Sequence, residues 1–496
     1  MATTGSTARA QFTWATDNAG NYGGSWTTGS NAGTGFGSWT LSAGAPAGNF
    51  AGNYIATPPN NGVSGFTGGN AFMQYAKFNN AGVFANADRS MSSALAIGDT
   101  LSFQWGVHWD VGNGTGAKGF NLYANGTTQV INLNNGGNGN IVLNDSTTVL
   151  TAFGSTAMTI NVTRNSASQL VVSTPQGRDG GSGFSQTLSG LNNTAIDAFR
   201  FYASRQEDND NRNNSFNNFR VANSGTYNFG GSITESRAMT GGGALTVGGS
   251  TTLTLTNAGN TFTGGSTVAA GSELTIGNGG ANGSLAGNVA NSGRLTFNSS
   301  SSLTYAGQLS GTGTFVKSGS GLLTLSGSSA GYAGATLLES GSLNVSGALG
   351  GTVEVSSGAV LVGALSVASG KTLGGSGTID GNVSLAAGAA FVFDPAETLT
   401  VQNGTVSFGG FGVDDILGLD QNTPDGTYTL IAGAVNLANV SNVGAGSAYS
   451  LGGGKSAYLQ AGSLQLVVVP EPPAVIAVVG GLAGVAAYGF RRRRRA

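Results

Sequence analysis

The sequence predicts an all-β protein built from a β-sandwich and a parallel β-helix, followed by one C-terminal transmembrane helix. Residues 11–225 alternate between apolar and polar side chains with a period of two, which is typical of half-buried strands. From about residue 230 the chain repeats itself at an offset of 70, which is typical of a solenoid. Residues 474–490 carry no charge and come directly before five arginines, the pattern of a membrane anchor.

The composition indicates turn-rich β-structure with a polar but nearly uncharged surface. The chain has 496 residues, 87 glycines, a formal net charge of -2 and only 8% charged residues. Ordinary soluble domains carry about 25% charged residues, so Asn, Ser, Thr and Gly must make this surface polar. The absence of cysteine excludes disulfides, thiolate metal sites and a cysteine nucleophile. Outside the arginine tail, the chain lacks the clustered Lys and Arg that a nucleic-acid partner requires.

Residues 11–225 predict the sandwich head. The large apolar residues of the segment 101–109, LSFQWGVHW, fall on one face of a strand: Leu101, Phe103, Trp105, Val107 and Trp109. The same spacing recurs at Met158, Ile160 and Val162, at Phe199 and Phe201, and at Phe219 and Val221. Asn-Gly and glycine-rich turns separate these segments, which favours a sandwich of jelly-roll type. Residues 196–221 resemble the last strands of concanavalin-like sandwiches.

Residues 230–347 predict β-helical repeats, and residues 348–469 predict further rungs and a cap. The offset aligns Gly241 with Gly311, Gly243 with Gly313, Gly249 with Gly319 and Leu253 with Leu323. Residues 309–347 contain G-x-G-T-hydrophobic, L-T-L-S-G, aromatic-x-G and G-x-L elements. In these elements, residues 239–347 resemble the autotransporter-associated β-strand repeat. That resemblance implies a right-handed parallel β-helix.

Residues 470–496 predict a membrane anchor that also carries a sorting signal. As a helix, residues 474–490 would span about 25 Å, enough to cross a thin bilayer. The basic cluster that would hold the C-terminus in the cytoplasm is Arg491, Arg492, Arg493, Arg494 and Arg495. The alternative is a buried helix with a solvated basic tail.

The end of the chain resembles the PEP-CTERM sorting signal, which combines Pro470-Glu471-Pro472, an apolar helix and terminal arginines. The resemblance implies that the protein is a substrate of an exosortase. It would be anchored in the inner membrane during sorting, cleaved near the motif, and then carried to the cell surface or the exopolysaccharide matrix. Pro470, Glu471 and Pro472 would be the recognised positions.

Residues 1–10 are expected to be the remnant of an export signal. They contain neither a basic segment nor an apolar segment, but Ala8-Arg9-Ala10 has the A-x-A form of a signal-peptidase site. We therefore expect Met1 to be an internal start with the signal encoded upstream. The alternative is a chance match in an alanine-rich sequence.

The sequence predicts no enzyme. His108 is the only histidine, so any Ser-His-Asp or histidine–metal arrangement must use it, and it is expected to face solvent on a strand. Asp110 is the nearest acid in sequence, ahead of an expected turn. No strand has the E-x-D-x-E pattern of sandwich glycosidases. A surface protein of structural or adhesive function is therefore the leading hypothesis, and a polysaccharide-degrading lyase or glycosidase is the alternative.

One acidic cluster in the head is a candidate calcium site, and calcium is the only cofactor that the sequence suggests. Glu207, Asp208 and Asp210 can supply carboxylate oxygens to Ca²⁺. The favoured alternative is a solvated loop whose charges are balanced by Arg205 and Arg212. The acidic residues Asp414, Asp415 and Asp420 are open to the same two interpretations.

The head is also a candidate glycan-binding domain, with exopolysaccharide as the partner. Four residues of polar parity are the candidate contacts: Gln104, His108, Arg200 and Tyr202. Trp26 or Trp39, both close to glycines, would add an aromatic platform. The hypothesis is modest binding of a neutral or weakly acidic glycan, and the alternative is an ordinary hydrated sheet face.

Overall fold

The chain is all-β, as predicted, with a β-solenoid of about 9 turns and sandwich-like sheets. The computed structural model describes residues 12–471, except residues 57–59, 79–80, 110, 112–114, 137–139, 145–148, 153, 177–178, 180, 192–193, 330 and 346–350. The chain forms two compact units. The first contains Met1–Leu274 and Gly283–Asn288, and the second contains Thr275–Asn282 and Val289–Ala496.

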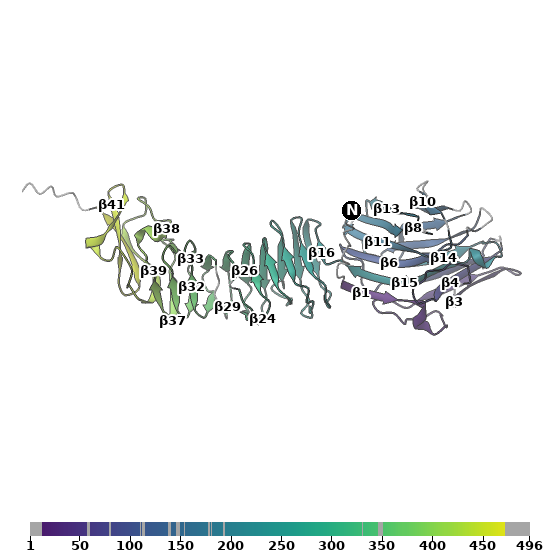
Figure 1. The fold of residues 1–496 in the computed structure, drawn as a ribbon, viewed down its shortest axis with the longest axis horizontal. Helices are drawn as coiled ribbons and strands as arrows, with labels where there is room; N and C mark the ends of the chain where they lie inside the picture. The colour runs from purple at the N-terminus through teal and green to yellow at the C-terminus, as the bar shows by residue number, and fades with distance from the viewer. Residues whose placement is uncertain are drawn as a thin grey trace, which may run out of the picture. The chain divides into compact units, whose positions relative to one another are not determined.

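The head consists of two antiparallel sheets (Figure 1). The eight-stranded sheet has the order β13 (Ser182–Ser189), β12 (Gln169–Gln176), β11 (Met158–Ser166), β6 (Asp99–Gly106), β15 (Asn214–Asn223), β4 (Ala71–Lys77) and β3 (Phe50–Ala56), and β1 (Phe12–Asp17) pairs with β15. The seven-stranded sheet has the order β10 (Val149–Ala152), β9 (Asn140–Leu143), β8 (Thr128–Asn135), β7 (Ala117–Ala124), β14 (Ile196–Ser204), β5 (Phe84–Ser90) and β2 (Thr40–Gly44). The described residues of the head also form two short 3-10 helices, η1 (Ala19–Tyr22) and η3 (Asp210–Arg212).

Aromatic side chains between the two sheets form the core of the head. Phe201 on β14 stacks on Phe216 on β15 with ring centroids 3.8 Å apart. Phe103 on β6 lies 4.5 Å from Phe120 on β7. Each pair has one ring from each sheet, so the sheets pack face to face. The prediction that the apolar face of β6 points into the core is confirmed. Trp109 is an exception: β6 ends at Gly106, and Trp109 is 37% exposed.

The first unit also contains the first rungs of the solenoid. The strands β16 (Thr226–Tyr227), β18 (Leu245–Val247) and β20 (Ser266–Val268) pair in parallel, as do β17 (Gly231–Glu235) and β19 (Thr251–Leu255). Their register places Tyr227 beside Val247 and Val247 beside Val268. All three side chains are buried. Stacking of equivalent apolar residues from rung to rung is how a solenoid builds a continuous core.

The second unit continues with short parallel strands and ends in an antiparallel cap (Figure 1). One sheet includes β23 (Arg294–Asn298), β26 (Thr314–Ser318), β28 (Thr336–Leu338), β30 (Val353–Val355), β33 (Thr372–Gly375), β36 (Ala390–Val392) and β38 (Ile416–Leu417). Another includes β24 (Leu303–Tyr305), β27 (Leu322–Leu325), β29 (Ser342–Val345), β31 (Val360–Val362), β34 (Thr378–Asp380), β37 (Leu399–Phe408), β39 (Gly426–Val435), β42 (Leu464–Pro470), β41 (Lys455–Gln460) and β40 (Tyr449–Gly452). Pairing is parallel up to β39 and antiparallel from β39 through β42 and β41 to β40.

The remaining elements are short. They are β21 (Glu273–Ile276), β22 (Val289–Asn291), β25 (Leu309–Ser310), β32 (Leu365–Val367), β35 (Val383–Leu385), η4 (Val413–Asp415) and η5 (Ala445–Ser447). In the described part of the chain, no helix has the length and apolarity needed to cross a bilayer. The predicted helix at 474–490, the arginine cluster, Pro472 and residues 1–10 all lie outside the described residues.

A buried cluster of charges joins the head to the first rungs within the first unit. Arg237, which follows β17, donates hydrogen bonds to Asp99 at the start of β6, at 2.6 and 3.1 Å. The same guanidinium bonds Glu235 at 2.8 and 2.7 Å and lies 4.3 Å from the centre of the Trp14 ring. Asp99 also accepts from Trp14 Nε1 at 3.0 Å. The side chains of Asp99 and Glu235 are 0% and 3% exposed, so one cation serves two carboxylates away from water.

The pKa values of this cluster follow from burial and pairing. Burial raises the pKa of Asp99, and the hydrogen bonds from Arg237 oppose that rise. Burial alone would lower the pKa of Arg237, but the hydrogen bonds to Glu235 and Asp99 outweigh it and the pKa is raised. Arg237 therefore stays charged, and its removal would leave two carboxylates in a poorly solvated place.

We expect Arg237→Met to destabilise the head strongly. Removing one partner of a buried ion pair typically costs about 3–5 kcal/mol of the free energy of unfolding. All five tryptophans lie between residues 14 and 109, so their fluorescence in a urea titration reports on the head. The control is Arg200→Met, which breaks an ion pair whose side chains are 37% and 30% exposed and should cost under about 1 kcal/mol. Equal losses in the two variants would contradict the structural importance of the buried cluster.

Candidate functional site

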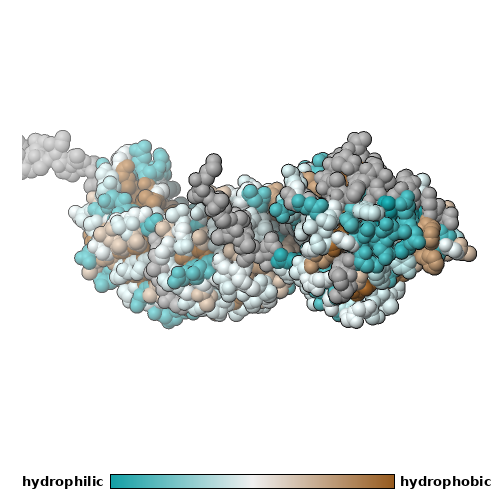
Figure 2. Space-filling view, turned by 45° about the vertical axis from the view of Figure 1, so that its right-hand side comes forward, coloured by the Kyte–Doolittle hydropathy of each residue, from teal (hydrophilic) through white to brown (hydrophobic). Residues whose placement is uncertain are grey.

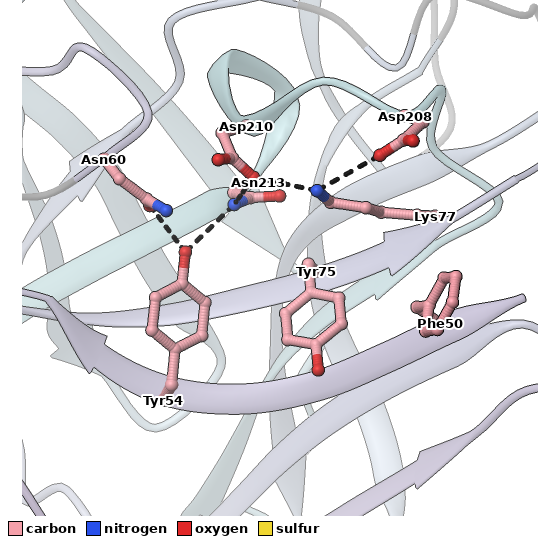
Figure 3. Close-up of a pocket in the computed structure, with 8 residues that line it drawn as sticks. All are labelled: Phe50, Tyr54, Asn60, Tyr75, Lys77, Asp208, Asp210 and Asn213. Carbon is pink, nitrogen blue, oxygen red and sulfur yellow. Dashed lines mark hydrogen bonds and ion pairs between the residues drawn. The ribbon is translucent and has the colours of Figure 1, made fainter.

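An open groove lies on the outer face of β3 and β4, at the edge of the eight-stranded sheet. It encloses about 540 Å³ and is lined by Phe50, Tyr54, Asn60, Tyr75, Lys77, Asp208, Asp210 and Asn213 (Figure 3). The pairing of the two strands places Phe50 beside Lys77 and Gly52 beside Tyr75. These side chains point away from the core because the alternate residue Phe72 is fully buried in it.

Tyr54 and Tyr75 form the floor of the groove. Their ring centroids lie 5.8 Å apart in an edge-to-face arrangement, and Figure 3 shows the rings side by side above β3. The Tyr75 ring lies over Gly52, where an added Cβ would come within 2.7 Å of the Tyr75 hydroxyl. The absence of a side chain at Gly52 therefore lets the ring lie flat along the strand.

Amide side chains hold Tyr54 in place. Its hydroxyl donates to Asn60 Oδ1 at 2.5 Å and accepts from Asn213 Nδ2 at 3.0 Å. Burial raises the pKa of Tyr54, and the two amide hydrogen bonds only partly offset this, so the hydroxyl stays protonated at neutral pH. A neutral, oriented phenol beside two amides presents both donors and acceptors to a ligand.

The wall of the groove is an ion-paired loop. Lys77 Nζ lies 2.9 Å from Asp210 Oδ1 and 3.1 Å from Asp208 Oδ1. Burial alone would lower the pKa of Lys77, but the hydrogen bonds to Asp210 and Asp208 raise it, so the amine stays charged. Gln206 fixes the loop to β4, because its backbone N–H donates to Ala76 O at 2.7 Å and its side chain accepts from Ala76 N–H at 3.1 Å.

These ion pairs account for all three residues of the candidate calcium site. Asp208 and Asp210 bind Lys77, and Glu207 lies 2.9 Å from Arg212. Over the ranges described above, no group of three or more acidic, histidine or cysteine side chains is placed to hold a metal. In this arrangement Lys77 and Arg212 pair with the carboxylates of the loop, and Lys77 is a partner that the sequence did not indicate.

The four predicted glycan contacts do not come together. Gln104 lies on the outer face of the eight-stranded sheet, where it bonds Asn218 and the Thr67 amide. Arg200 and Tyr202 lie on β14, on the outer face of the opposite sheet. His108 follows the end of β6 and is partly buried, with Nδ1 2.7 Å from Asn61 O, so its expected solvent-facing position in a strand is wrong.

Arg200 and Tyr202 belong to a polar network on the seven-stranded sheet. Asn132 Nδ2 donates to Tyr202 Oη at 2.9 Å and to Asn121 Oδ1 at 2.6 Å. Arg200 Nε lies 2.6 Å from Asp88 Oδ1. These groups satisfy one another, whereas the groove at β3 and β4 is hollow.

Several other candidates have structural roles. Trp26 and Trp39 are 5% and 0% exposed in the core of the head, so neither offers a platform to a ligand. Asp415 accepts a hydrogen bond from Gly412 N–H at the start of η4. Asp420 accepts from the Asn422 and Thr423 amides in a turn, and these bonds, led by the one from Asn422, lower its pKa. Asp110 lies outside the described residues.

The sequence contains a partial signal for the groove. Phe50, Gly52 and Tyr54 alternate on β3, and Tyr75 and Lys77 alternate on β4, so their shared parity is visible. The pairing of these two strands, and the attachment of a loop from the far end of the head domain, are not visible without the fold.

Comparisons with known proteins give only distant likenesses. No protein-family model matches the chain, and no curated protein matches it in sequence. Among solved structures, the chain is similar to the CBM2 module of Lactobacillus casei BL23 phage J-1 evolved Dit, with 16% identity, a TM-score of 0.25, and coverage of 43% of this chain and 97% of that one. It is also similar to lectin II from Ulex europaeus, with 10% identity, a TM-score of 0.24, and coverage of 37% and 98%. A protein of unknown function from Shewanella oneidensis MR-1 has 12% identity, a TM-score of 0.23, and coverage of 44% and 90%. At TM-scores this low, the likenesses carry no argument about function.

Proposed function

We propose that the protein is an exported, surface-sorted structural or adhesive component of an exopolysaccharide matrix, and that its head binds glycan in the groove at β3 and β4. The proposal includes a concanavalin-like head and a right-handed solenoid. The observation that carries glycan binding is a hollow with a tyrosine floor beside carboxylate and amide groups. The apolar face of a sugar ring packs on aromatic rings, while its hydroxyls bond to planar acceptors and donors.

The described surface fits a protein that works in a hydrated polymer matrix. Figure 2 shows a largely hydrophilic or neutral exterior on the viewed face, with hydrophobic residues in small patches. Only 8% of all residues are charged, so this polarity comes from Ser, Thr, Asn and backbone groups. Such a surface offers polysaccharide hydrogen bonds mainly from uncharged groups.

Surface sorting rests on the C-terminal segment. Pro470 is the last residue of β42 and pairs with Lys455. Glu471 N–H donates to Gly454 O at 2.7 Å, and the Glu471 carboxylate accepts from Ser450 Oγ at 2.5 Å. The motif Pro470-Glu471-Pro472 therefore begins where the cap ends, so cleavage just after it would leave every strand of the cap intact.

The intact mass of the protein purified from its native cells tests sorting. We expect the mature protein to lack the residues after about Glu471, because an exosortase would remove the apolar helix and arginines. Recovery of the full C-terminus would contradict processing and make residues 474–490 a permanent anchor.

Affinity electrophoresis in gels that contain a neutral polysaccharide tests the groove. Tyr75→Ala removes the ring that lies on β3, and we expect the apparent dissociation constant to rise about tenfold, the usual worth of one aromatic contact. The matched control is Tyr428→Ala in the cap, where the hydroxyl donates to Pro424 O. Retardation that Tyr75→Ala leaves unchanged would contradict the proposed site.

A further inference from the structure

The charges of the groove are unequal in number and in exposure. Its lining contains one cation, Lys77, and two anions, Asp208 and Asp210. The Lys77 side chain is 22% exposed, while those of Asp208 and Asp210 are 52% and 51% exposed. The neighbouring Glu207–Arg212 pair is neutral in sum. The carboxylates are therefore more open to a ligand than the lysine, whose ammonium lies between them (Figure 3).

The carboxylates of Asp210 and Asp208 differ in the hydrogen bonds that they can still accept. Asp210 Oδ1 already accepts from Lys77 and lies 3.4 Å from Asn213 Nδ2. Asp208 is paired with Lys77 through Oδ1 only, and its Oδ2 has no hydrogen-bond partner among the described residues. Asp208 Oδ2 is thus an acceptor on a half-exposed carboxylate that lines the tyrosine-floored hollow.

We infer that the groove prefers glycans that carry a free amino group, binds neutral glycans more weakly, and binds uronic-acid polymers most weakly. The inference rests on the proposed glycan binding and names its ligand class, in place of the neutral or weakly acidic glycan expected from the sequence. A protonated sugar amine would donate a charge-assisted hydrogen bond to Asp208, while the sugar ring packs on Tyr75. A uronate would instead bring a third carboxylate towards Asp208 and Asp210.

The expected difference in affinity between amino-bearing and neutral glycans is small because the carboxylates of the groove are half-exposed to water. Two unit charges about 4 Å apart in water interact by about 1 kcal/mol, which corresponds to about fivefold in affinity. We therefore expect a modest preference for the amine, and one that weakens as added salt screens exposed charges.

The test uses the full chain and three probes: a chitosan hexasaccharide, the same oligosaccharide fully N-acetylated, and an oligogalacturonate. Calorimetry is done at low salt and at a pH that keeps the amine protonated. We expect the amine to bind about fivefold more tightly than its acetylated counterpart, and the oligogalacturonate to bind about fivefold more weakly than the acetylated form. Asp208→Asn keeps the shape of the side chain and removes its charge, so it should abolish the preference for the amine over its acetylated counterpart.

The matched control is Asp394→Asn, an exposed aspartate in the second unit whose carboxylate accepts from Ala396 N–H. It should leave the preference for the amine intact, which separates the groove from general attraction to an acidic chain. Equal binding of the amine and the oligogalacturonate would overturn the inference while leaving glycan binding in place. So would a preference for the amine that survives Asp208→Asn. Failure of all three probes to bind would overturn the proposed function together with the inference.

Discussion

The shared ion cluster around Arg237 is the constraint on which the first compact unit depends. One guanidinium satisfies Asp99 from the head and Glu235 from the first rungs, and both carboxylates are almost completely buried. Burying charge is costly unless every partner is in place, so the cluster tolerates one geometry of β6 against β17. Phe12 reinforces the junction, with its ring 5.6 Å from that of Phe262. Ion pairs of Arg237 and the contact between Phe12 and Phe262 therefore attach the head to the first rungs of the solenoid.

The packing of the two sheets of the head explains why the groove lies on the outer face of β3 and β4. Inward residues such as Phe72 fill the core, which leaves the opposite face of β3 and β4 free for Tyr54 and Tyr75. The loop that carries the aspartates connects β14 to β15 and pairs with the end of β4, where Gln206 bridges to Lys77. Gln206 anchors that loop to the backbone of β4, so the aspartates stand at a fixed place beside the tyrosine floor.

Local periodicity predicted much of the fold and little of the site. The alternation of apolar and polar residues identified the buried residues of β6, β11, β14 and β15. Successive side chains of any strand point to opposite faces of its sheet, so this signal does not depend on the order of the strands. It failed at Trp109, where the strand stops, and at Trp26 and Trp39, whose nearby glycines indicated exposure although both rings fill the core. The groove depends on strand order and on the ion pairs of Lys77 with Asp208 and Asp210, contacts between residues far apart in sequence. Such contacts leave no periodic signal.

A crystal structure of the chain with a chitosan oligosaccharide tests the central claim most directly, that the head recognises an amino-bearing glycan in the groove at β3 and β4. The account predicts a sugar ring packed on Tyr75, with its amine within hydrogen-bond distance of Asp208. A sugar bound instead on the seven-stranded sheet beside Arg200 and Tyr202, or an empty groove at saturating ligand, would contradict it.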